Sequence, residues 1–242
     1  IIWPSPDDQT QSLVTRRTPQ VEVAMQKGSA DASLTFGNDA YSLAGATYEI
    51  RQCDDDALAA TVTTDATGRA SCSLKPGVRY YAQETRAPAG YLLASGRVEF
   101  EAKAGQVGGL DDVPATAEVR VQKVDSSTGG AAQPGASLAG AELTLVDAQG
   151  RTHVSTTDAE GRASFDGLPL GRVRVTESRA PEGYKASQQV LEAEATAAQV
   201  GQNGIASISM ESALKEDVVA FDLEIAKFKD YGQEGSGLEQ PA

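Results

Sequence analysis

The residues in this sequence best suited to chemistry are lysines placed where a core residue belongs. Lys27 ends the run VEVAMQK (21–27), Lys123 ends the run EVRVQK (118–123), and Lys227 ends a partial copy, DLEIAK. Side chains alternate across a β-strand, so each lysine shares a face with the apolar residues two and four positions before it. We therefore expect these amines to point into the core of a β-sheet protein.

A glutamate recurs in the same way on a later run. Glu84 ends VRYYAQE (78–84) and Glu177 ends VRVTE (173–177), each with apolar residues two and four positions earlier. Snorkelling or an ordinary buried salt bridge would explain one such position. Recurrence of both charges favours a chemical role, because buried ion pairs are costly. Burial favours a neutral amine and a neutral acid, the state in which an amine attacks a side-chain carbonyl beside a proton donor.

Both pairs belong to an internal repeat. TTDATGRAS (63–71) recurs as TTDAEGRAS (156–164), and ETRAPAGY (84–91) recurs as ESRAPEGY (177–184), a shift of 93 residues in both cases. Four matched blocks in one order indicate a duplicated domain. The expected organisation is a leader or linker (1–20), a first domain (21–114), a second domain (115–219), and a truncated third repeat or tail (220–242).

Each repeat has the pattern of an all-β domain. Short alternating runs such as VEVAM, ATYEI and RVEFEA are separated by turn clusters such as DATG, KPG and APAG. This spacing predicts tandem β-sandwiches. The Ala-rich segment LEAEATAAQV aligns with a strand-like run of the first repeat and is interpreted as a strand. Gln106 to Thr116 is expected to be a short connector that keeps the domains in line.

Composition disfavours several classes of function. With 21 basic and 34 acidic residues the net charge is −13, and no basic cluster exists to bind nucleic acid or an anionic membrane. No apolar stretch is long enough to enter a bilayer. The single histidine, His153, disfavours histidine-based catalysis and most transition-metal sites. We therefore expect no cofactor and no metal, and interpret Asp54–Asp56 as a solvated acidic turn.

The ordered motifs resemble a known family over about residues 21–219. The pattern consists of a strand lysine, a GA-x-Y/L strand, TTD-x-x-G and E-x-x-AP-x-GY, in this order. It is similar to that of Cna protein B-type (SpaA-like, prealbumin-like) domains, which build the stalks of Gram-positive adhesins and pilins. The resemblance implies a reversed-immunoglobulin β-sandwich in which lysine bonds spontaneously to an Asn or Asp side chain. It implies Lys27 and Lys123 as nucleophiles and Glu84 and Glu177 as the catalytic acids, each acting once and not as an enzyme.

The acceptor departs from the family pattern, which usually offers Asn in an N-x-P-like segment. The chain contains only Asn38 and Asn203. In the first repeat LDDVP puts Asp112 in the acceptor place, and an Asp acceptor loses water rather than ammonia. In the second repeat the matching region is MESALKEDVV. There Asp217 is the leading candidate, Glu216 also fits the spacing, Asn203 lies in a QNG turn, and the absence of an acceptor is the remaining alternative.

The resemblance also implies a setting. A stalk segment would be extracellular and anchored to the cell wall through regions outside this sequence. Its partners would be neighbouring domains of the same surface protein, with host matrix or glycan bound through other domains.

The alternative functions are a β-sandwich that binds glycan or matrix without isopeptide bonds, and a hydrolase using Glu84 with an aspartate. A duplicated inward pair argues against a hydrolase cleft. Cys53 and Cys72 could close one disulfide, or be two thiols with no special role.

Overall fold

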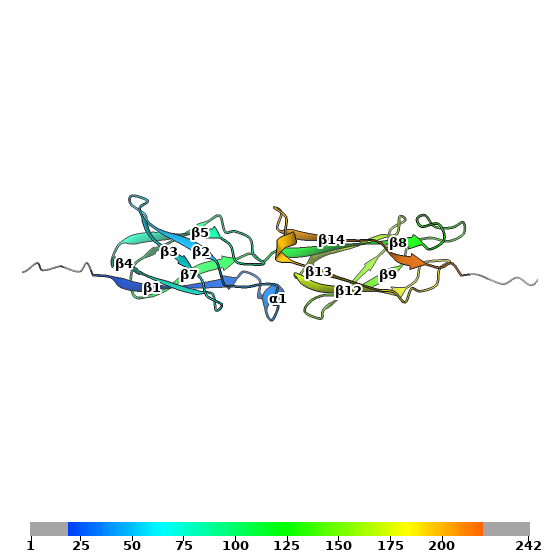
Figure 1. The fold of residues 1–242 in the computed structure, drawn as a ribbon, viewed down its shortest axis with the longest axis horizontal. Coiled ribbons are helices and arrows are strands. Elements are labelled where there is room, and N and C mark those ends of the chain that lie inside the picture. The colour runs from blue at the N-terminus through cyan, green and yellow to red at the C-terminus, as the bar shows by residue number, and fades with distance from the viewer. Residues whose placement is uncertain (1–18, 220–242) are drawn as a thin grey trace, which may run out of the picture.

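The computed structural model describes residues 19–219, which form two β-sandwiches arranged end to end (Figure 1). The described chain enters at one end of this rod and leaves at the other. Most of the expected leader and all of the expected third repeat, including Lys227, lie outside the described residues.

The first domain packs a three-stranded sheet against a four-stranded sheet. The strand orders are β4-β1-β7 and β3-β2-β5-β6. Its elements are β1 (Val21–Ser29), α1 (Ala32–Thr35), β2 (Thr47–Gln52), β3 (Leu58–Thr63), β4 (Arg69–Leu74), β5 (Arg79–Arg86), β6 (Arg97–Glu101) and β7 (Gly105–Asp112).

The second domain repeats this arrangement strand for strand. Its sheets have the orders β11-β8-β14 and β10-β9-β12-β13. Its elements are β8 (Thr116–Asp125), β9 (Glu142–Val146), β10 (Thr152–Thr156), β11 (Arg162–Leu168), β12 (Gly171–Arg179), β13 (Val190–Ala195), the 3-10 helix η1 (Ala197–Gln199) and β14 (Ile205–Glu216). The chain is therefore an all-β protein of tandem sandwiches, as the repeat predicted.

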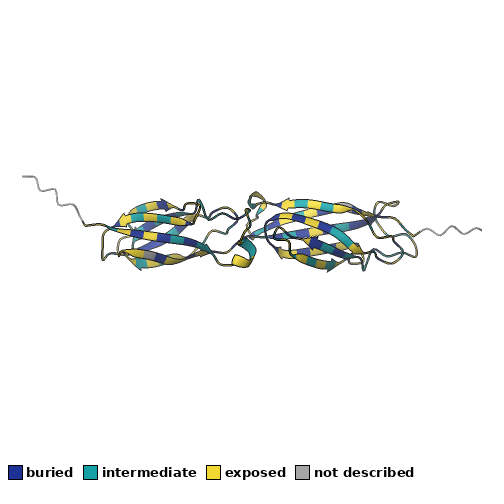
Figure 2. Ribbon diagram, turned by 90° about the horizontal axis from the view of Figure 1, so that it is seen from below, coloured by how far each residue is buried: buried dark blue, intermediate teal, exposed yellow. Residues whose placement is uncertain are grey.

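The first and last strands of each domain lie side by side. β1 pairs with β7, and β8 pairs with β14, in both cases in parallel. Parallel neighbours require a long crossover, and here the whole intervening domain is that crossover. The alternating burial along these strands (Figure 2) keeps one face of each in the core, which includes Val23 and Met25 in the first domain and Val119 and Val121 in the second.

Two local expectations were wrong. The expected connector from Gln106 to Thr116 is largely strand β7, because this Gly-rich segment pairs with β1 from Val23 onward. In LEAEATAAQV only the first part is strand. β13 ends at Ala195, and the chain then turns through η1, so strand and helical turn share the segment.

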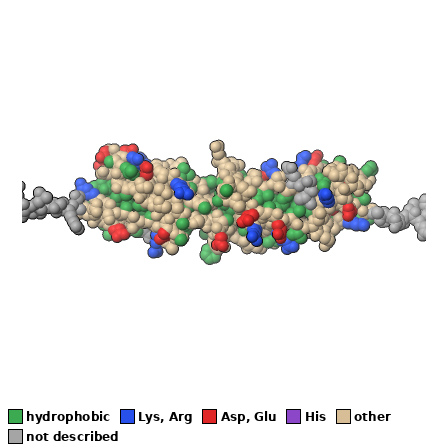
Figure 3. Space-filling view, in the orientation of Figure 1, with side chains coloured by type: hydrophobic (Ala, Val, Ile, Leu, Met, Phe, Trp, Pro, Cys, Tyr) green, Lys and Arg blue, Asp and Glu red, His purple; other side chains and the backbone are tan. Residues whose placement is uncertain are grey.

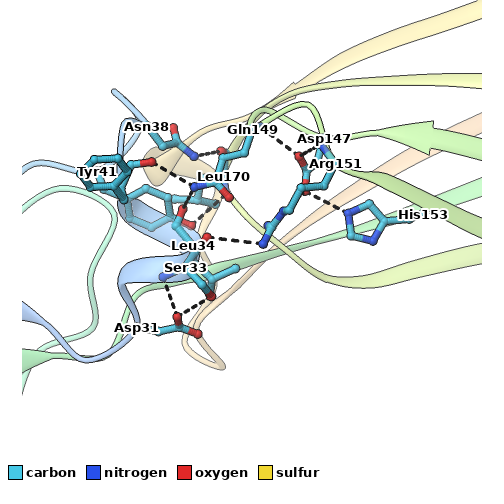
Figure 4. A network of polar contacts seen from close by, with 11 residues as sticks. Asp31, Ser33, Leu34, Asn38, Tyr41, Asp147, Gln149, Arg151, His153 and Leu170 are labelled. Carbon is cyan, nitrogen blue, oxygen red and sulfur yellow. Dashed lines mark hydrogen bonds and ion pairs between the residues drawn. The ribbon is translucent and has the colours of Figure 1, made fainter.

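A loop of the first domain docks on the second (Figure 4). The Tyr41 hydroxyl donates to the carbonyl of Ala115 (2.7 Å) and accepts from the amide of Leu170 (2.9 Å). Asn38 donates to the Leu170 carbonyl (2.9 Å), and Gln149 donates to the Leu34 carbonyl (3.1 Å). Because the Tyr41 side chain packs in the hydrophobic core of the second domain, it couples the two sandwiches.

Removal of this hydroxyl should loosen the junction measurably. Tyr41→Phe leaves two buried backbone groups unpaired, which costs about 1–3 kcal/mol each when no water replaces the bond. We expect amide hydrogen exchange at Leu170 to accelerate by at least tenfold. Tyr81→Phe is the matched control, because the Tyr81 hydroxyl bonds to Asp56 within the first domain and away from the junction. Equal exchange at Leu170 in both variants would contradict this role for Tyr41.

Candidate functional site

The first domain buries a lysine between two carboxylates. Lys27 on β1 forms an ion pair with Glu84 on β5 (Nζ to Oε1, 3.0 Å) and another with Asp112 at the end of β7. All three side chains are at most 1% exposed. The three residues come from three different strands and both sheets, so the fold alone brings them together.

Backbone contacts hold the lysine and the glutamate in place. The Lys27 amide donates to the carbonyl of Gly68 (2.8 Å), which lies in the turn of the TTD-x-x-G motif. Gly68 has a φ of 77°, and a Cβ there would lie 2.7 Å from the Lys27 carbonyl oxygen, so the turn requires glycine. The second carboxylate oxygen of Glu84 accepts from the Ala94 amide (2.9 Å). The motif therefore fixes the position of the lysine.

The charge balance of this cluster requires a proton. One ammonium between two ionised carboxylates would leave a buried net charge, which is strongly unfavourable. Burial raises the pKa of Asp112 to about 6, although Lys27 opposes the shift. The cluster is neutral when Asp112 is a carboxylic acid, and an acid beside an amine and a second carboxylate is the set of groups that amide formation needs.

The raised pKa predicts a pH-dependent stability that can be measured without any bond formation. In Lys27→Met the opposing ammonium is gone, so burial and Glu84 both keep the Asp112 pKa above its unfolded value of 3.8. The folded state then binds the proton more tightly than the unfolded state. Stability is full below about pH 4 and is lost progressively as the pH rises from there through 6, by roughly 3 kcal/mol for two pKa units.

Urea unfolding of Lys27→Met at pH 4 and pH 8 measures this effect. Lys27→Met/Asp112→Asn is the control, since the amide does not titrate and should remove most of the difference. A Lys27→Met variant that is equally stable at both pH values would contradict the assignment of a buried acid at Asp112.

The second domain holds an equivalent cluster. Lys123 on β8 forms ion pairs with Glu177 on β12 and with Glu216 at the end of β14, the latter at 2.8 Å (Nζ to Oε1). All three side chains are fully inaccessible to solvent. Glu177 also accepts from the Ser187 amide (2.6 Å), ten residues along the chain, as Glu84 accepts from Ala94. Burial raises the pKa of Glu216 to about 7, with Lys123 opposing.

Asp217, the leading candidate for the acceptor of the second domain, does not lie beside Lys123. Strand alternation points Glu216 inward with Leu214, whereas Asp217 points away and its carboxylate accepts from the Ser126 hydroxyl. Asn203 lies at the other end of β14, in the turn before Ile205, whose amide donates to it (3.2 Å). Of the candidates named from the sequence, only Glu216 contacts Lys123.

The prediction of a disulfide between Cys53 and Cys72 is wrong. Cys53 and Cys72 are both free. Cys72 lies on β4 and packs against the first-domain core, whereas Cys53 follows β2 in the opposite sheet and its amide bonds to the Arg79 carbonyl. The two thiols therefore belong to separate sheets.

Tyr48 is a further residue beside the first-domain cluster, and it was not among the residues predicted from the sequence. This residue lies on β2 opposite Glu84, its ring centroid is 5.4 Å from the Lys27 amine, and its buried hydroxyl has no hydrogen-bond partner among the described residues. It lines a cavity of about 110 Å³ together with Glu84 and Asp112. The alternation of Tyr48 with Ile50 in ATYEI could have predicted that its side chain points into the core. Nothing in the sequence marked the Ala94 amide.

Acidic and basic side chains are interspersed along the face shown in Figure 3. Among residues 19–219 no group of three His, Cys, Asp or Glu side chains is placed to hold a metal ion. Within the same range no helix has the length and apolar character needed to cross a membrane.

Comparison with known proteins identifies the domains. The family model described as SpaA, a prealbumin-like fold domain, matches residues 36–111 and again residues 117–211. The chain belongs to this SpaA family. Both matches fall on the sandwiches described above, and each SpaA domain carries one buried lysine cluster. No curated protein sequence matches the chain significantly.

Solved structures with a similar fold include bacterial pilins and a pilus adhesin. The Bacillus anthracis TIE protein has 25% identity and a TM-score of 0.57, covering 82% of this chain and 34% of that one. The C-terminal fragment of the pilus adhesin SpaC from Lactobacillus rhamnosus GG has 18% identity and a TM-score of 0.44, covering 83% and 98%. BcpA, the major pilin subunit of Bacillus cereus, has 12% identity and a TM-score of 0.33, covering 83% and 100%. This SpaA tandem spans about a third of the length of the B. anthracis protein.

Proposed function

We propose that this chain is a structural stalk segment of a Gram-positive surface adhesin or pilin, in which an isopeptide bond joins the first and last strands of each domain. The observation that carries the proposal is the buried cluster of Lys27, Glu84 and Asp112, repeated around Lys123. The segment would be extracellular, linked to neighbouring domains of the same surface protein, and held at the cell wall through other regions.

The reaction in the first domain begins from Lys27 as ammonium, Glu84 as carboxylate and Asp112 as acid. Glu84 takes a proton from the ammonium, and the neutral Nζ attacks Cγ of Asp112. The Nζ–Cγ bond forms, the Cγ–OH bond breaks, and the hydroxyl leaves as water with a second proton from the amine. Glu84 ends protonated beside the new amide. Each site reacts once, so this is not enzymatic turnover.

Burial supports this direction of the reaction. Amides hydrolyse slowly in water, but the equilibrium in a dry site disfavours the charged amine and carboxylate that hydrolysis regenerates. The three side chains are nearly inaccessible, so the ion pair is costly before the reaction and the neutral amide is not. A spontaneous condensation inside the folded domain follows from this difference.

The position of the bond suits a load-bearing stalk. β1 and β7 are neighbours and carry the entrance and exit of the first domain, so force applied along the rod passes through this pair. A bond between Lys27 and Asp112 carries that force covalently and leaves the intervening chain unloaded. Unlike a disulfide, it withstands reduction.

Peptide mapping of the full chain tests the proposal. Trypsin should give residues 18–51 joined to residues 104–120, because a modified Lys27 is not cleaved. Glu84→Gln keeps the shape but removes the proton acceptor, so we expect the two peptides to separate and Lys27 to be cleaved. Recovery of unmodified peptides from folded parent protein would overturn the proposal.

A further inference from the structure

We infer that the second domain is closed by a bond between Lys123 and the side-chain carboxyl of Glu216, with glutamate in the acceptor role that aspartate has in the first domain. This inference rests on the proposed function, since it assigns the acceptor for the same kind of reaction. One stalk segment would then contain a β-aspartyl and a γ-glutamyl isopeptide.

The strand register places Glu216 relative to Lys123 as it places Asp112 relative to Lys27. On the first sheet Lys27 pairs with Leu110, and Asp112 lies opposite the residue two positions after the lysine. On the second sheet Lys123 pairs with Leu214, and Glu216 likewise lies opposite the residue two positions after the lysine. Each acceptor therefore follows an inward leucine by two residues and faces the same core.

The surrounding side chains compensate for the longer acceptor. In the four-stranded sheet of the first domain Tyr48 lies opposite Glu84, and in that of the second domain Leu143 occupies the equivalent place opposite Glu177. Leucine is smaller than tyrosine, and the glutamate at 216 is one methylene longer than aspartate. The paired differences keep a close-packed core around the reacting atoms.

A buried carboxylate on the same strand as Lys123 already accepts several hydrogen bonds. Asp125, on the same strand, accepts from the amides of Ser127 and Thr128 at 2.9 and 2.8 Å, and from Gln133 and Tyr184, both at 2.9 Å. These bonds use both of its oxygens and stabilise the ionised form. Neither oxygen of Glu216 has a hydrogen-bond partner in the described part of the chain, although one forms the ion pair with Lys123.

The reaction that forms this bond follows the same steps as in the first domain. Glu177 takes a proton from the Lys123 ammonium, the neutral Nζ attacks Cδ of protonated Glu216, the Nζ–Cδ bond forms and the Cδ–OH bond breaks. Water leaves with the second amine proton. The raised pKa of Glu216, caused by burial, supports the protonated acceptor.

Three full-chain variants test the assignment by intact mass and peptide mapping. The parent should lose one water at this site and give residues 121–151 joined to the peptide that contains Glu216. Glu216→Gln, which preserves the shape, should still react but lose ammonia in place of water. Glu216→Ala should leave Lys123 unmodified, and Asp217→Asn should retain the bond with the same loss of water.

The first-domain peptides separate the possible failures. If residues 18–51 and 104–120 are joined but Lys123 is unmodified or joined to Asp217, the glutamate assignment is overturned and the proposed function stands for the first domain. If neither lysine is joined in folded protein, the proposed function fails as well. Loss of water rather than ammonia from Glu216→Gln would also overturn the assignment.

Discussion

Pulled from its two ends in a force spectrometer, the first domain should extend by only a few residues of chain. A bond between Lys27 and Asp112 bypasses about 85 residues, which would otherwise contribute roughly 300 Å of contour length at about 3.5 Å per residue. Because β1 and β7 are the strands through which force enters and leaves the domain, the bond intercepts the load directly. The parent should therefore show no unfolding step of this size from the first domain.

Glu84→Gln should restore that step. Without the glutamate the amine keeps its proton, the bond does not form, and the domain unravels fully once its strands separate. Glu49→Gln is a suitable control, since Glu49 is on the same sheet but pairs with Arg51 at the surface. A step of roughly 300 Å in both the parent and Glu84→Gln would contradict the proposed load path.

The same substitution should lower the thermal stability of the first domain sharply. Closing a loop of about 85 residues stabilises a folded domain by about 4–5 kcal/mol on chain-entropy grounds. For a domain of this size such a loss corresponds to a decrease in Tm of about 20 °C or more. Calorimetry of Glu84→Gln should therefore show an early first-domain transition that the parent lacks.

The second domain provides an internal reference in the same experiment. Its cluster around Lys123 is untouched by Glu84→Gln, so its transition should move only by the change transmitted through the Tyr41 junction. A parent and a variant that melt together at one temperature would show that no cross-link was lost.

The repeat and the alternation of side chains were sufficient to predict much of this structure. Because Lys27 and Lys123 end apolar runs with a period of two, their inward orientation followed from the geometry of a strand. The matching of TTDATGRAS with TTDAEGRAS likewise predicted two copies of one sandwich, and the structure shows the same strand order in both. The chemistry at the lysines stays a prediction until it is measured.

The acceptor of the second domain could not be derived in this way, because a bulge decides it. Between Met25 and Lys27 the partner strand advances by three residues, whereas between Val121 and Lys123 it advances by four. A bulge of different length shifts which residues face inward, and a shift of one residue exchanges Glu216 for Asp217. Spacing from the repeat alone carries no information on bulge length.

The cysteines illustrate a second limit. A separation of 19 residues is compatible with a disulfide, but the sequence does not state which sheet each strand joins. Spacing leaves open whether Cys72 and Cys53 form one bond, and the sandwich topology places them in opposite sheets. Local pattern predicts the elements, whereas pairing between sheets depends on the whole chain.

The most direct test of the central claim is the intact mass of the purified full chain under reducing and denaturing conditions. We expect a mass lower than that of the sequence by two waters, one for each lysine cluster. A folded, homogeneous sample with the mass of the unmodified sequence would contradict it, and would leave Lys27 and Lys123 as members of ordinary buried ion pairs.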